Sequence, residues 1–325
     1  MDLPLSGSAS GRRSLSRRSL LLGVGAAGLL GGSALAGKRV AAVRAGGAAV
    51  SIALEPSAPF AFLSTDAVAQ AGAFSLHVHS YYADSGSATF NGQPVPLLVD
   101  GTYLVALFGA GQPVDAPVEL APGAYSVRVD ISSAGAGPYT FELPISVTAW
   151  PFTADYVTLP PGLDSLLDPS VVQQELVTLR STYGVASERA RWKGLFSQPV
   201  QGEITTQFGE GRSYNGGPVG GHHSGVDIAA NAGTPVGCAA TGRVAFAGQV
   251  AERGNFVIVD HGLGVYTGYA HLSAINVAVG AGVAQGEILG LVGTTGLSTG
   301  PHLHWECAVN GIHVDALRWT RDLLP

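Results

Sequence analysis

The 325-residue chain has little charge and few long apolar runs. Charged residues make up only 12% of it and hydrophobic residues 46%, so it can bury a large core and is not a disordered tail. Beyond the N-terminus, no continuous apolar run is long enough to span a bilayer. The length predicts two folded domains, and the 46 glycines fit the many turns of a β-rich fold.

Cysteine and basic residues are also scarce. Cys238 and Cys307 can form one disulfide in an oxidising compartment or remain two buried thiols, and their separation in sequence does not decide between these alternatives. Without residues 1–36, which hold four arginines and one aspartate, 13 basic and 22 acidic residues remain, a formal net charge of −9. Such an acidic chain does not suit non-specific binding of nucleic acid, which needs a positive surface.

The N-terminus predicts export. Four arginines precede an uncharged stretch from Leu20 to Ala36, and residues 34–36 (ALA) form a small-x-small cleavage site. Residues 16–21 (SRRSLL) resemble a twin-arginine signal, with Leu20 where phenylalanine is usual. We therefore expect residues 1–36 to be an export signal that sends the protein to the periplasm, the cell envelope or the medium. An uncleaved membrane anchor is the alternative, and the small-residue cleavage site argues against it.

Short alternating strands dominate the first half of the remaining chain. Residues 37–47 are expected to be a linker. Residues 48–150 then predict a small β-sandwich of immunoglobulin-like type, with strands at 74–80, 103–108, 124–130 and 141–147. His77 and His79 share one face of the first of these strands. They can bind a metal, but no third ligand is near in sequence, so we expect ordinary surface or edge positions.

A connector and a second strand-rich region follow. Residues 151–194 contain a convincing helix over 169–183, with Asp168 as N-cap and its apolar face formed by Val172, Leu176 and Leu179. A second short helix is expected over 187–193. Residues 195–325 return to strands with glycine turns, so the expected fold is mostly β.

The histidines gather in the C-terminal region. Seven of the nine lie after position 220, chiefly in HHSGVDI (222–228), YAHL (269–272) and GPHLHWE (300–306). In a strand, His302 and His304 point the same way. His223 and Asp227 are four apart, but Gly225 and its β-branched neighbours disfavour a helix, so we expect a loop histidine and a strand aspartate.

One aspartate and two histidines form a three-ligand zinc set that leaves a fourth position open, as in catalytic zinc sites. The alternative is that Asp227 caps a turn and the histidines are incidental. The choice between these two interpretations comes from the ordered combination of six segments: GHHSGVDIAA (221–230), AGTPV (232–236), GRV (242–244), GNFVIVDHG (254–262), YAHLS (269–273) and TGLSTGPHLHWE (295–306). This combination resembles the whole catalytic core of the lysostaphin/LytM-type zinc endopeptidases, over roughly residues 195–320.

The resemblance implies roles for individual residues and a C-terminal antiparallel β-sheet metallopeptidase domain over 195–325. The positions that match the family's zinc ligands are His223, Asp227 and His304. His271 and His302 match the residues that flank the zinc-bound water, as general base and stabiliser of the oxyanion, in an order that the sequence leaves open. His222 is one residue early for the ligand role and is expected to be a bystander.

The resemblance implies an exported endopeptidase with one Zn²⁺ per chain that cuts peptide bonds in bacterial peptidoglycan, at peptide stems or cross-bridges. We expect a monomer and favour direct cross-links between stems over glycyl bridges. The alternatives are a non-catalytic regulator of cell-wall amidases with the same fold, an exported binding protein, and a peptidase for glycine-rich proteins. Such regulators lack the zinc ligands, which are all present here.

Three further expectations concern the surroundings of the site. The glycine-rich stretch 290–300 is expected to form one wall of a substrate groove. Arg212 and Tyr214 are expected to touch substrate or to serve the structure. The domain over 48–150 is expected to position the enzyme, bind the wall or occlude the groove.

Overall fold

The computed structural model describes residues 39–45, 48–54, 59–79, 83–100, 103–114, 120–133, 138–183 and 189–323. The chain divides into two units, Met1–Ala36 and Gly37–Pro325, and the described residues all belong to the second. The expected export signal lies outside the described residues. Part of the expected linker is instead strand β1 (Arg39–Ala45), paired antiparallel with β2 (Ala48–Leu54), because valines favour extended backbone.

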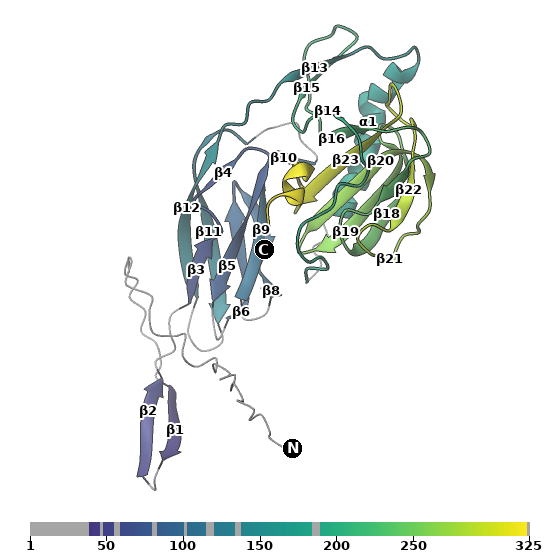
Figure 1. Cartoon of the computed structure of the whole chain (residues 1–325). Coiled ribbons are helices and arrows are strands. Elements are labelled where there is room, and N and C mark those ends of the chain that lie inside the picture. Colours follow the sequence, from purple (N-terminus) through teal and green to yellow (C-terminus); the bar gives the residue numbers. More distant parts are fainter. Residues whose placement is uncertain are drawn as a thin grey trace, which may run out of the picture. The chain divides into compact units, whose positions relative to one another are not determined.

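The predicted β-sandwich is confirmed and consists of two sheets, although it begins at Phe60 and does not include β2 (Figure 1). One sheet has the order β3 (Phe60–Leu63), β5 (Gly72–His79), β9 (Tyr103–Ala110) and β8 (Leu98–Asp100). The other has the order β4 (Ala67–Ala69), β12 (Tyr139–Thr148), β11 (Gly123–Ser133), β6 (Ala83–Phe90) and β7 (Gln93–Pro96). Alternate residues of both sheets form one buried core, as the alternating sequence pattern predicts.

The connector contains the predicted helix, α1 (Pro169–Tyr183). Asp168 caps it: its carboxylate accepts the backbone N–H of Ser170 at 2.8 Å. The 3₁₀ turn η1 (Leu163–Leu167) precedes it. The predicted helix over 187–193 is wrong for its described residues 189–193, which are not helical. Arg191 N–H instead donates to the carbonyl of His261 at 2.7 Å, and Trp192 is buried in the core, so this segment packs against the sheet.

The C-terminal half forms an antiparallel sheet, as expected: ten of the eleven strands come from this half, and β10 joins them from the N-terminal half. Its main path runs β10 (Gln112–Pro113), β24 (Ile312–Val314), β23 (His302–Val309), β20 (Val265–Ile275), β19 (Gly254–Gly262), β18 (Gly242–Val250) and β21 (Gly282–Val283). Branching from it are β14 (Ile204–Thr206), β16 (Gly225–Ala229), β17 (Pro235–Gly237) and β22 (Ile288–Val292). A separate parallel pair joins β13 (Ala154–Val157) to β15 (Gly211–Tyr214), and the 3₁₀ turn η2 (Ala316–Thr320) closes the chain.

Helix α1 packs on this sheet through a buried apolar cluster. Leu179 and Tyr183 lie with Phe256, Ile258 and Tyr266 of the sheet. Of the predicted apolar face, Leu179 is fully buried, whereas Val172 is only partly buried. The most buried stripe of the helix instead contains an acid, Glu175, four residues before Leu179.

Cys238 and Cys307 are both buried free thiols, on β17 and β23, so the disulfide alternative is wrong. Burial raises the pKa of Cys238 to about 11 and that of Cys307 well above its usual value. Within the described ranges, no helix combines the length and apolar character needed to cross a membrane.

Candidate metal centre

Strands β16 and β23 bring together the three residues that match zinc ligands. Asp227 and His304 are direct partners in the antiparallel register of these strands, and His223 lies two residues before β16. Asp227 Oδ1 is 3.0 Å from His223 Nε2 and 3.0 Å from His304 Nδ1, and the two ring nitrogens are 2.8 Å apart. All three side chains are buried.

The close approach of the two strands depends on Gly225. A Cβ at this position would lie 2.5 Å from the carbonyl oxygen of Trp305 and 3.0 Å from the ring of His304. Any side chain at 225 would therefore push β16 away from β23. The glycine in the first histidine motif thus sets the distance between Asp227 and His304.

The hydrogen bonds around the cluster orient its donor atoms. His223 Nδ1 donates to the carbonyl of Gln207 at 2.9 Å, which leaves a lone pair on Nε2. His304 Nε2 faces the carboxylate of Glu306 at 3.3 Å, which leaves Nδ1 to face Asp227. Three acceptors that converge in this way repel one another unless a cation or a proton lies between them.

The electrostatics favour positive charge at this point. Burial lowers the pKa of His223 to about 4, so this ring is neutral at physiological pH. Burial raises the pKa of Asp227, but His223 and His304 outweigh burial and bring the pKa well below its usual value. Burial lowers the pKa of His304, but hydrogen bonds to Asp227 and Glu306 outweigh it, so the net pKa is raised.

The donor set fits zinc. Neutral imidazoles and a carboxylate are ordinary zinc ligands, and tetrahedral zinc with ligand bonds of about 2.0–2.1 Å separates its ligands by roughly 3.3 Å. The donor separations of 2.8–3.0 Å are close to that value. Among the described residues, the cluster of possible metal donors comprises these three side chains and not His222, whose ring lies near Phe152.

His271 and His302 lie beside the cluster. Their ring centroids are 4.7 Å apart, and His302 Nε2 is 3.6 Å from Asp227 Oδ1. Each ring faces a backbone carbonyl through Nδ1 at 2.8 Å, Thr295 for His271 and Gly300 for His302, so each Nε2 is available for proton transfer. Burial, followed by the neighbouring histidines, brings the pKa of His271 well below its usual value, so this ring is neutral.

The backbone of His271 is unusual for a residue with a side chain. Its φ is 60°, in the left-handed region, and its N–H donates to the carbonyl of Arg253 at 2.8 Å. Such a conformation is uncommon for a residue other than glycine and is held here by the surrounding sheet. It fixes the direction in which the His271 ring leaves β20.

A second layer of charged residues, which the sequence did not reveal, surrounds the histidines. Arg212, assigned only to substrate or structure, bridges Asp227 Oδ2 and Asp155, each at 3.0 Å. Glu306 is fully buried and accepts from Arg253 and from Tyr183 of α1. The signal for Glu306 was present, because residues 302, 304 and 306 share one face of a strand.

The cluster opens into a cleft of about 770 Å³. Its walls include the connector residues 155–159, strand β15 with Arg212 and Tyr214, and the loop 297–301. The loop belongs to the glycine-rich region that was expected to form one wall. Residues 112–114 also line this cleft.

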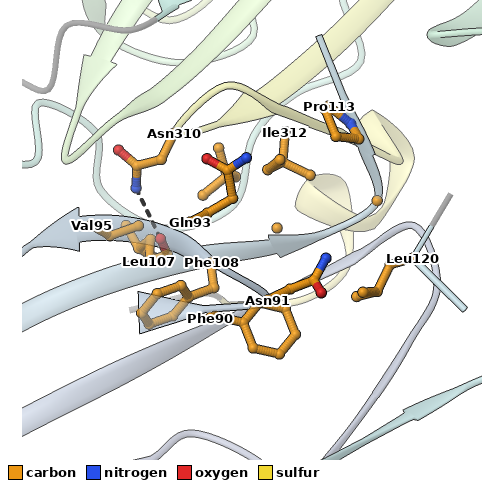
Figure 2. A pocket seen from close by; sticks show the side chains of 13 residues that line it. Phe90, Asn91, Gln93, Val95, Leu107, Phe108, Pro113, Leu120, Asn310 and Ile312 are labelled. Carbon is orange, nitrogen blue, oxygen red and sulfur yellow. Dashed lines mark hydrogen bonds between the residues drawn. The ribbon is translucent and has the colours of Figure 1, made fainter. Parts of the chain in front are cut away.

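A second cavity, of about 110 Å³, lies between β9 and β24 and contains no charged or histidine side chain (Figure 2). Phe90, Phe108 and Ile312 line it, and Asn310 Nδ2 donates to the carbonyl of Leu107 at 2.9 Å. Without titratable groups it offers no acid–base or metal chemistry. His77 and His79, in turn, stack on Phe62 and Phe60 with ring centroids 5.1 Å apart.

The described histidine–aspartate centre lies within a recognised family domain. Residues 221–316 match peptidase family M23. The chain carries an M23 peptidase domain. The domain contains the three residues of the cluster and the two histidines beside it, His271 and His302.

Known proteins resemble this chain over different lengths. It is 52% identical over 89 residues to the DD-carboxypeptidase/endopeptidase Mpg of Neisseria meningitidis, a match that covers 27% of this chain and 20% of Mpg. It is 43% identical over 96 residues to the peptidoglycan DD-endopeptidase ShyA of Vibrio cholerae, covering 30% of this chain and 22% of ShyA. These matches span only about a fifth of the two relatives.

A crystal structure from Pseudomonas aeruginosa, assigned to peptidase M23, resembles more of the chain. The similarity covers 78% of this chain and 94% of that one, with a TM-score of 0.56 and 27% sequence identity. It therefore extends beyond the M23 domain, which spans residues 221–316.

Proposed function

We propose that the protein is an exported zinc-dependent endopeptidase that hydrolyses peptide bonds in bacterial peptidoglycan. The observation that carries the proposal is the convergence of His223 Nε2, Asp227 Oδ1 and His304 Nδ1, with the rings of His271 and His302 beside them in an open cleft. These three donors would hold the zinc ion and leave a fourth position free.

In this proposal, bound zinc supplies a Lewis acid that lowers the pKa of water and polarises the scissile carbonyl. His271 and His302 act as the general base and as the stabiliser of the oxyanion. Their Nδ1 atoms donate to carbonyls, so a neutral ring offers an Nε2 lone pair that accepts a proton from the attacking water, and a ring protonated on Nε2 donates to the developing oxyanion. The cleft positions an extended peptide between the loop 297–301 and the connector.

The names of the relatives favour a particular bond. Mpg is called a DD-carboxypeptidase/endopeptidase and ShyA a peptidoglycan DD-endopeptidase. We propose that this chain likewise cuts direct cross-links between stem peptides. The proposed site of action is the periplasm, cell envelope or medium, after removal of residues 1–36, with the protein acting as a monomer.

In this proposal, residues 48–150 form a β-sandwich domain that positions the enzyme, binds the cell wall or occludes the substrate groove. Removal of this domain raises activity if it occludes the groove, and weakens wall binding if it is an anchor. Residues 151–194 connect it to the endopeptidase domain over 195–325.

The test combines metal content with turnover. We expect the purified protein to hold about one zinc per chain and to release peptides from purified peptidoglycan, identified by mass spectrometry. His304→Ala should lose the zinc. His302→Ala should keep the zinc and lose about 10²- to 10⁴-fold in kcat, as expected for a residue that transfers a proton.

His77→Ala is the matched control, because this histidine stacks on Phe62 in the sandwich, on a different sheet from the cluster. It should change neither zinc content nor turnover. A wild-type protein that binds no zinc contradicts the proposal and favours the non-catalytic regulator of cell-wall amidases. Zinc binding with no peptide release, both in the full protein and after removal of residues 48–150, contradicts the peptidoglycan substrate.

A further inference from the structure

A buried carboxylate lies behind the proposed zinc ligand His304. Glu306 has no exposed surface, and its Oε2 is 3.3 Å from His304 Nε2. Ser224 Oγ donates to the same oxygen at 3.1 Å. Because His304 faces Asp227 through Nδ1 and Glu306 through Nε2, the two carboxylates hold the ring from opposite sides.

Glu306 is itself held by Arg253. The guanidinium donates to it through Nη2 at 2.9 Å and through Nε at 3.1 and 3.2 Å. This fork geometry fixes the plane of the carboxylate as well as its position. A carboxylate buried to this degree is costly unless it is paired in this way.

Two residues of helix α1 also hold Arg253 and Glu306 in place. Glu175 accepts from Arg253 Nη1 at 2.7 Å and from the backbone N–H of Glu252 at 2.6 Å. Tyr183 donates its hydroxyl to Glu306 Oε1 at 2.6 Å. Both residues are buried and lie on one face of α1, two turns apart.

These contacts form a continuous chain from the connector to the metal centre: Glu175, Arg253, Glu306 and His304. The M23 match begins at residue 221, so α1 (Pro169–Tyr183) lies outside it. The helix nevertheless supplies two of the buried polar groups around Glu306 and Arg253. The helix therefore does more than cover the sheet with apolar side chains such as Leu179: it also pairs buried charged groups next to the candidate metal centre.

We propose that Glu306 is the positioning residue of His304 and that helix α1, through Glu175 and Tyr183, completes the metal centre from outside the M23 domain. The inference rests on the proposed function, because the ring that it orients is a proposed zinc ligand. Loss of an α1 contact leaves His304 Nδ1 less well aimed at the point where His223 and Asp227 converge. The consequence is weaker metal binding with the three ligands intact.

The test measures zinc affinity by competition with a chromophoric chelator in the full-length protein. Partners of this kind commonly contribute 10- to 100-fold to metal affinity, so Glu306→Gln should raise the Kd for zinc at least about tenfold. Tyr183→Phe and Glu175→Gln act at one remove and should raise it by about three- to tenfold. Replacement of zinc by Co²⁺ gives a visible spectrum that reports ligand geometry, and we expect it to change in all three variants.

Tyr269→Phe is the matched control. Tyr269 is also fully buried, and its hydroxyl accepts from the backbone N–H of Ala239 at 2.8 Å, away from Glu306. Its loss should lower the stability of the protein but leave the zinc Kd and the Co²⁺ spectrum unchanged. If Glu306→Gln does not fold, Tyr183→Phe decides, because it removes a single hydroxyl.

Two results overturn the inference. One is a wild-type zinc Kd and Co²⁺ spectrum in Tyr183→Phe and Glu175→Gln; the other is an equal loss of affinity in Tyr269→Phe. In both cases a wild-type protein that binds zinc and releases peptides leaves the proposed function standing. A wild-type protein that binds no zinc instead refutes the proposed function, and the inference with it.

Discussion

His261 provides a pH test of the sheet core. The ring is fully buried on β19, with Nδ1 donating to the carbonyl of Thr241 at 3.0 Å and Nε2 2.7 Å from the hydroxyl of Thr267. Phe196 lies against it with a centroid distance of 5.0 Å. Burial lowers the pKa of His261 to about 4 from an ordinary value of 6.5.

The sign of the effect follows from where the proton binds first. As pH falls below 6.5, the unfolded chain protonates this histidine while the folded chain does not, so the folded state loses stability until the pH reaches about 4. With one pKa unit equal to about 1.4 kcal/mol, the loss between about pH 8 and pH 5 is about 2 kcal/mol. Its limit below about pH 4 is roughly 3 kcal/mol.

The assay compares the wild type with His261→Asn, whose amide can still donate to Thr241. Denaturant unfolding of the metal-free proteins at several pH values gives the free energy of unfolding of each. His223 and His271 also have lowered pKa values, but they titrate in both proteins and cancel in the difference. The wild type should lose about 2 kcal/mol more than His261→Asn over this pH range, and equal losses would refute the reasoning.

Two other predictions concern the thiols and the glycines. With its pKa near 11, Cys238 should have about one thousandth of its thiol ionised near pH 8. Iodoacetamide should therefore label it slowly in the folded protein and rapidly after unfolding. Rapid labelling of the folded protein would contradict the burial of this thiol. Gly225→Ala should cost about 1–3 kcal/mol of unfolding free energy and also weaken zinc binding, because the added Cβ meets the carbonyl of Trp305. Gly282→Ala is its control, since a Cβ there meets no atom within 4 Å, and equal effects of the two substitutions would contradict the close-approach argument.

Local sequence patterns predicted much of the fold. The strands of the sandwich follow from alternating residues, and α1 from its N-cap Asp168, the proline that follows and an apolar repeat. The expected helix over 187–193 failed in its described part because Trp192 packs into the core. Tertiary burial outweighed local propensity there.

The cysteines show the limit of such patterns. Nothing local indicates whether two positions 69 residues apart lie side by side, and here Cys238 and Cys307 are on strands that are not neighbours in the sheet. The same limit applies to the partners of the candidate metal centre. Glu175 and Arg253 are 78 residues apart, and no spacing rule links a helix acid to an arginine in a distant loop.

By itself, the sequence determined the kind of site: the spacing within HHSGVDI and HLH supplies two imidazoles and a carboxylate, and strand periodicity places residues 302 and 304 on one side. Only the tertiary structure decided how these groups are held. The pairing of β16 with β23 places Asp227 opposite His304, and the packing of α1 on the sheet brings Glu175 and Tyr183 to Arg253 and Glu306. The physical reason is that ligand chemistry is a property of residue types and short spacings, whereas buried charges are paired only by contacts that the folded chain creates.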